Sequence, residues 1–157
     1  MGLARYQRNA WEDQFKRPTE KELRDAFSSR HNASLFEQTL AAFRERPGLK
    51  EQLAWHGVPW CWSYVFTNGK DDGVPAAMVI PDAQSGPKVV VPMPPAVVTV
   101  LTSNGISPEA RFAIDHSRGA CGSAWPQFDI TGKAKLEAVV SLVQQRLSAS
   151  PGGAKRH

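Results

Sequence analysis

The clearest pattern along the chain is an alternation of aromatic and smaller side chains over residues 60–67. The aromatic positions are Trp60, Trp62, Tyr64 and Phe66, and the positions between them are Cys61, Ser63, Val65 and Thr67. Because successive side chains of a β-strand point to opposite faces, this pattern predicts a strand with one aromatic face. That face is either buried against helices or partly open as a platform for a ligand. Aromatic side chains dominate core burial, which favours the first alternative.

Three further short runs predict the rest of a sheet. Residues 75–80 and 88–91 are largely apolar and are separated by turn residues, and residues 125–130 form a later strand. Short connections between consecutive strands favour antiparallel pairing. We therefore predict a mainly antiparallel four-stranded sheet, made of a strand meander over 60–91 and a strand at 125–130.

Capping residues predict two helices before the first strand. Two pairs have the spacing of a capping box, Thr19 with Glu22 and Ser34 with Glu37. They predict one helix over about 20–29 and a second helix that starts at Ser34 and ends before Pro47. Residues 50–55 are predicted only as a short further turn.

Three more helices are predicted after the third strand. Pro94-Pro95 and Gly105 bound a helix over 96–102, although its β-branched valines argue against it. Ser107-Pro108 is a stronger helix start, with a cap followed by proline at the first helical position. Thr131 is predicted to cap a last, long helix with an apolar stripe of Leu136, Val139, Val140, Val143 and Leu147.

Together these elements predict a two-layer α+β fold with helices packed on one face of the sheet. A length of 157 residues suits a single domain. We place this domain at residues 18–148, after a polar N-terminal arm at 1–17 and before a disordered basic tail at 149–157.

The composition is that of an ordinary globular protein, with 41% hydrophobic and 22% charged residues. No apolar run approaches the roughly 20 residues of a membrane helix. The N-terminus also lacks the apolar core of a signal peptide. We therefore expect a cytoplasmic protein without a membrane partner. Cys61 and Cys121 have no CxxC partner and are expected to be free thiols.

The formal net charge of +4 lies towards the two ends of the chain. Residues 1–30 carry seven Lys or Arg against five Asp or Glu, and Lys155-Arg156 add two more positive charges. Basic side chains at chain ends neutralise phosphates without reading bases, so any nucleic-acid binding is expected to be weak, non-specific and sensitive to salt. The candidate contacts are Arg5, Arg8, Lys16 and Arg17.

A second hypothesis places a small-molecule pocket at one end of the aromatic strand. Four aromatic side chains crowd a small sheet and leave room for a pocket there. Its candidate ligand-binding residues are His56, Trp60, Trp62 and Tyr64. His116 and Cys121 could also pair as a base and a thiol nucleophile. A histidine stabilised at a helix C-terminus is the simpler interpretation of His116. Because no metal-ligand spacing or nucleotide motif occurs, no metal or cofactor is predicted.

Three short segments carry a family resemblance. They are Gly57-Val58-Pro59 before the first strand, the Pro94-Pro95 helix start, and Trp125–Ile130 leading into the last helix. With them, the order of elements over residues 50–148 resembles small bacterial α+β domains of the MmcQ/YjbR type. Two family features are displaced, to Gly69-Lys70 inside a longer loop and to Gly122 before the tryptophan. The resemblance implies a bacterial protein with suggested DNA binding and no established catalytic residues.

These observations lead to three hypotheses for function. The first is a non-enzymatic binding module that binds nucleic acid weakly and without sequence preference. The second is a small-molecule-binding protein or enzyme that uses the aromatic pocket near Trp60–Tyr64. The third is a homodimeric protein–protein adaptor that associates through an exposed strand edge.

Overall fold

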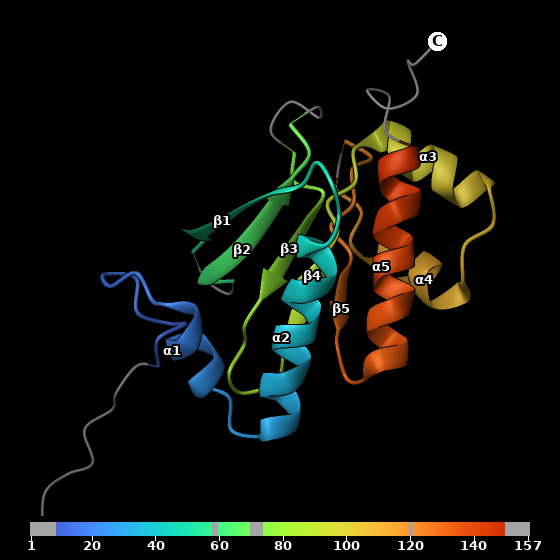
Figure 1. Ribbon diagram of the computed structural model, residues 1–157. Helices are drawn as coiled ribbons and strands as arrows, with labels where there is room; N and C mark the ends of the chain where they lie inside the picture. Colours follow the sequence, from blue (N-terminus) through green and yellow to red (C-terminus); the bar gives the residue numbers. More distant parts are fainter. Residues whose placement is uncertain (1–8, 58–59, 70–73, 120, 150–157) are drawn as a thin grey trace, which may run out of the picture.

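A computed structural model describes residues 9–57, 60–69, 74–119 and 121–149. Figure 1 shows its helices and strands, which are α1 (Glu20–Asp25), α2 (Arg30–Arg44), β1 (Lys50–Trp55), β2 (Trp62–Thr67), β3 (Ala77–Ile80), β4 (Lys88–Val90), α3 (Pro95–Ser103), α4 (Pro108–His116), β5 (Gln127–Asp129) and α5 (Lys133–Ser148).

The five strands form one antiparallel sheet in the order β1-β2-β3-β4-β5 (Figure 1). The predicted α+β class is confirmed, but the sheet has five strands and not four. The additional strand is β1, which was predicted as a short turn. Of its residues only Leu53 is buried, so this edge strand lacks the clear alternation that marks a half-buried strand.

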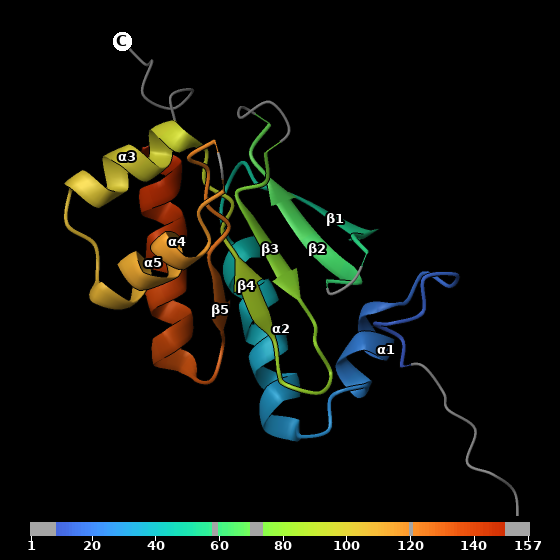
Figure 2. The same cartoon turned by 180° about the vertical axis from the view of Figure 1, so that it is seen from behind.

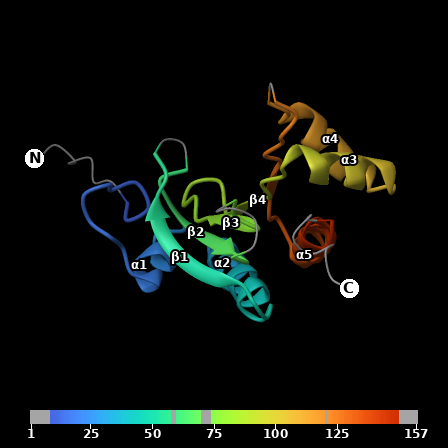
Figure 3. The same cartoon turned by 90° about the horizontal axis from the view of Figure 1, so that it is seen from above.

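The helices form two groups around the sheet (Figures 2 and 3). The helices α1, α2 and α5 lie on one side of the sheet, whereas α3 and α4 lie beyond β5 towards the other side. The register aligns Tyr64 with Val79, Val79 with Val89, and Val89 with Phe128. These side chains share one face, which α2 and α5 cover. We call it the helix-covered face.

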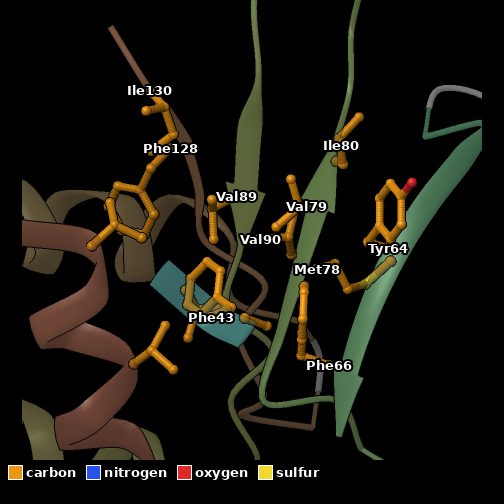
Figure 4. Packing of buried hydrophobic residues seen from close by; sticks show 14 of the residues in the cluster. Phe43, Tyr64, Phe66, Met78, Val79, Ile80, Val89, Val90, Phe128 and Ile130 are labelled. Carbon is orange, nitrogen blue, oxygen red and sulfur yellow. The ribbon is translucent and has the colours of Figure 1, made fainter. Parts of the chain in front are cut away.

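One part of the core lies between this face and the helices (Figure 4), and Met78, Ile80 and Val90 on the opposite face of β3 and β4 are also buried. Trp62, Tyr64 and Phe66 are buried, so the prediction that the aromatic row is core is confirmed for these three residues. The ring of Phe43 on α2 packs on Phe66 with centroids 5.4 Å apart. Figure 4 shows Phe128 pointing from β5 towards α5. Burial of such large rings is the main source of stability in a domain of this size.

Local capping explains where the first two helices begin. The capping box before α1 is confirmed, because Glu22 N donates to Thr19 Oγ1 at 3.1 Å and Thr19 N donates to Glu22 Oε1 at 2.9 Å. The helix α2 begins earlier than predicted, with Ser29 as its cap. Ser34 lies inside this helix, where its hydroxyl accepts from Gln38 Nε2. The Ser34–Glu37 spacing was therefore a coincidence.

The last helix buries a different stripe from the one predicted. It begins after Gly132 and not at a Thr131 cap, and it buries Leu136, Val139, Leu142, Val143 and Arg146. Val140 and Leu147 are only partly buried. Arg146 is fully buried. Its Nε donates to Pro92 O at 3.0 Å and its Nη2 donates to Pro75 O at 3.2 Å. A charged residue in a core stripe cannot be found by hydrophobic patterning.

The segment before α1 packs onto the start of β2. Trp11 belongs to the core, Trp62 N donates to Trp11 O at 3.3 Å, and Trp62 Nε1 donates to Asp13 O at 2.6 Å. The part of the predicted arm that is described is thus attached to the domain. Residues 1–8 and 150–157, which hold the rest of the predicted arm and most of the predicted tail, lie outside the described residues.

We expect the protein to lose stability as the pH rises from about 10 towards 12. Burial raises the pKa of Tyr64 to about 12 from its ordinary value of 10.0. The unfolded chain releases this proton at a lower pH than the folded one, so ionisation favours unfolding above the unfolded pKa. Tyr64→Phe should reduce this alkaline loss. Denaturant unfolding of both proteins at about pH 8 and about pH 11.5 measures the difference, and an equal loss in both would contradict this assignment.

Candidate functional site

The four residues predicted to bind a ligand do not lie together. Trp62 and Tyr64 point to the helix-covered face, where the ring of Tyr64 lies 6.1 Å from that of Phe36. His56 is exposed just after β1, and partial burial of its imidazole lowers its pKa. Trp60 lies on the opposite side of the sheet. Their assignment as one ligand site stays a prediction that this arrangement does not support.

A tight chain reversal before β2 moves Trp60 out of the aromatic row. Cys61 N donates to Gly57 O at 2.6 Å, and His56 N donates to Cys61 O at 2.8 Å. Cys61 has a φ of 49°, in the left-handed region that residues other than glycine rarely adopt. The prediction that Trp60 and Trp62 share a face is therefore wrong. An alternation of side chains carries no signal for such a reversal.

Trp60 instead contacts the far edge of the sheet. Its Nε1 donates to Gln127 Oε1 at 3.3 Å, and its ring stacks on Trp125 with centroids 5.9 Å apart and planes 26° apart. Gln127 neighbours Phe128 in β5, so it lies on the face turned away from α2 and α5. Trp11 Nε1 donates to Trp60 O at 3.1 Å, which ties Trp60 to the segment before α1. Segments that are far apart in sequence therefore hold this tryptophan pair.

Beside the tryptophan pair, an open groove of about 410 Å³ runs between β5 and α4. We call it the aromatic groove. Its lining includes Phe112, Ala113 and His116 of α4 on one side and Trp125, Gln127 and Asp129 on the other. Phe112 is 63% exposed and Trp125 is 40% exposed. A strand over residues 125–130 was predicted from the sequence, but no pattern linked this strand to Phe112.

His116 is held at the side of the aromatic groove by its own helix. Its Nδ1 lies 2.9 Å from Phe112 O, and its ring stacks on Phe112 with centroids 3.7 Å apart. In the part of the chain that the structure describes, His116 makes no hydrogen bond with Cys121. Both cysteines are free, as predicted, with Cys61 buried and Cys121 exposed. Burial raises the pKa of the Cys61 thiol.

Most basic side chains near the start of the described chain are paired with acids. The pairs are Lys16 with Glu22 at 3.4 Å, Lys21 with Asp25 at 2.8 Å and Arg24 with Glu37 at 3.6 Å, each measured from nitrogen to oxygen. Such pairs weaken the field that this surface offers to phosphates. Arg17 is exposed, whereas Arg5 and Arg8 lie outside the described residues. Nucleic-acid binding through these residues stays a prediction.

Within residues 9–57, 60–69, 74–119 and 121–149, His, Cys, Asp and Glu form no group of three or more that could hold a metal ion. No helix there is long and apolar enough to cross a membrane.

No family model, no curated protein and no solved structure matches the chain. The resemblance to the MmcQ/YjbR type therefore stays a prediction.

Proposed function

We propose that this chain is a binding module whose contact surface is the aromatic groove. The observation that carries this proposal is that two large aromatic side chains, Phe112 and Trp125, remain exposed on opposite sides of one concave surface. Scattered exposed apolar residues need no explanation, but aromatic residues gathered around a groove are typical of binding sites.

The rings of the groove are held in place before any ligand arrives. Trp125 stacks on Trp60, and Trp60 is fixed in turn by its bonds to Gln127 and Trp11. Phe112 stacks on His116. A surface whose side chains are already ordered loses little conformational entropy on binding, so more of the contact energy remains as affinity.

The charges around the groove favour a neutral or cationic ligand. Asp129 Oδ1 lies 3.6 Å from Lys88 Nζ, and the carboxylate of Glu109 forms an ion pair with Lys135. The two carboxylates are 63% and 59% exposed, whereas the two lysines are only 15% and 27% exposed. A ligand therefore meets the carboxylates first, which disfavours a phosphate backbone at this surface. This charge arrangement supports a binding role for the groove that is separate from the nucleic-acid hypothesis.

Indole is a suitable first probe, because its flat ring can stack on Trp125. We expect a titration followed by amide and indole N–H chemical shifts to perturb Trp125, Trp60 and Gln127 selectively. Trp125→Ala should weaken indole binding by about threefold to tenfold, which is the usual effect of losing one aromatic contact.

Phe15→Ala is the matched control, since Phe15 is 86% exposed and is absent from the groove lining. It removes an exposed aromatic ring of similar chemistry and should leave indole binding unchanged. Shifts spread evenly over the surface, or equal effects of the two substitutions, would contradict the proposed site.

A further inference from the structure

The backbone of β5 has hydrogen-bonding groups that point away from the sheet. Backbone bonds join this part of the chain to β4 and its extensions, among them Met93 N to Ala124 O at 2.8 Å, Val91 N to Pro126 O at 3.0 Å and Ile130 N to Pro87 O at 2.9 Å. Bonded and non-bonded residue pairs alternate in an antiparallel ladder. Phe128 therefore also bonds to β4, whereas the N–H and C=O groups of Gln127 and Asp129 point outwards.

The backbone of Trp125 confirms this direction and marks one end of the free edge. Trp125 N, which follows the same alternation, donates outwards to Ser117 Oγ at 3.1 Å. No hydrogen bond from a described residue reaches the outward backbone groups of Gln127 and Asp129. Because β5 is the last strand of the sheet, these groups remain available to a partner.

The free edge of β5 borders the aromatic groove. Gln127 and Asp129 line one side of this groove, and Phe112, Ala113 and His116 of α4 line the other. An exposed strand edge beside a helix is a geometry in which an extended peptide binds, with backbone bonds for affinity and side-chain contacts for specificity.

We propose that the aromatic groove binds an extended peptide segment of a partner protein, which adds as a sixth strand to the outer edge of β5. This inference rests on the proposed binding role of the groove and names the class of partner. Two residues of the peptide would exchange hydrogen bonds with Gln127 and Asp129, and alternate side chains would contact Trp125 and Phe112.

Charge complementarity indicates which peptides fit. The end of the groove near Asp129 and Glu109 presents carboxylates that are more exposed than their lysine partners. The opposite part presents Trp125 and Phe112. The preferred segment therefore combines an aromatic or aliphatic residue with a basic residue.

The other edge of the sheet is less suited to strand addition. On β1 the residues Lys50, Glu51 and Gln52 are all exposed. Charged side chains along an edge strand discourage pairing with another chain. The two edges therefore differ, and β1 serves as an internal control.

The test uses the capped peptide acetyl-KVFVK-amide, whose sequence is the same in either chain direction. We expect it to shift the amide signals of Gln127 and Asp129 and to slow their hydrogen exchange, while β1 amides stay unchanged. Replacing both lysines with glutamate should weaken binding.

Two N-methylated versions of this peptide test the backbone bonds. One is methylated at both valines and the other at the phenylalanine and the last lysine. Only one set of amides can face β5, so one version should bind about tenfold or more weakly while the other retains affinity.

Two protein variants separate the backbone from the side chain at one position. Gln127→Pro removes the outward N–H without removing a bond to β4, whereas Gln127→Ala keeps that N–H. Both variants lose the side-chain bond to Trp60, so the difference between them isolates the backbone donor. Gln127→Pro should bind the peptide at least about threefold more weakly than Gln127→Ala, which corresponds to one hydrogen bond.

The outcomes distinguish this inference from the proposed function. Indole binding without peptide binding would retain the groove as a site and overturn strand addition. Equal binding of the unmodified peptide and its two N-methylated versions, or protection of β1 in place of β5, would also overturn it. Protection of Gln127 and Asp129 in a concentration-dependent dimer without peptide would assign the edge to a second copy of this chain and overturn the peptide proposal.

Discussion

Trp62→Ala should lower the free energy of unfolding by about 3–5 kcal/mol, the range observed when large buried aromatic residues are truncated. Trp62 is only 8% exposed. Its ring lies edge-to-face against Trp55 with centroids 5.9 Å apart, and its Nε1 donates to Asp13 O at 2.6 Å. The substitution therefore leaves a cavity and also removes the side-chain hydrogen bond from Trp62 to the segment that precedes α1.

Chemical denaturation of the variant measures this loss. Trp125→Ala is the matched control, because it truncates the same residue type at a site that is 40% exposed. We expect the control to cost less than about 1 kcal/mol, as is usual for surface substitutions. A loss below about 1 kcal/mol for Trp62→Ala as well would show that the helix-covered face is not the stabilising core.

Arg146→Ala should be similarly destabilising, by about 3–5 kcal/mol. The guanidinium is fully buried and donates to the carbonyl oxygens of Pro75 and Pro92. Truncation leaves a cavity and removes these donors, and a buried acceptor without its donor costs about 1–3 kcal/mol. Arg146→Met restores much of the volume but no donor, so it should cost less than Arg146→Ala while remaining destabilising.

Denaturant unfolding of both variants separates volume from hydrogen bonding. Gln145→Ala, at an exposed neighbouring position of α5, should stay within about 0.5 kcal/mol of the unchanged protein. An Arg146→Met protein that is more stable than the unchanged protein would show that desolvation of the guanidinium outweighs its hydrogen bonds, as happens for some buried charges.

The fold was predictable where one local rule decides the structure. Alternation identified the buried faces of Tyr64 and Phe66, and the capping box at Thr19 located the start of α1. The fold was not predictable where contacts between residues distant in sequence determine the structure. The strand β1 depends on its partner β2, because its own residues are mostly polar.

The aromatic groove was the least predictable feature. Trp60 reaches it through the positive φ of Cys61, and it then contacts Gln127, a residue 67 positions further along the chain. Phe112 and His116 come from a helix whose sequence shows only an ordinary amphipathic pattern. Neither hydrophobic periodicity nor residue spacing contains information about such long-range contacts.

Folding of the β1–β4 meander requires only short loops to close, because these strands pair in the order of the sequence, whereas residues 91–126 with α3 and α4 separate β4 from β5. The bond from Trp11 to Trp60 spans 49 residues, and that from Arg146 to Pro75 spans 71 residues. Loop closure costs more entropy as the loop lengthens, and contacts between distant residues slow folding. We therefore expect the meander to form first, and these two contacts to join the ends of the described chain to it late in folding.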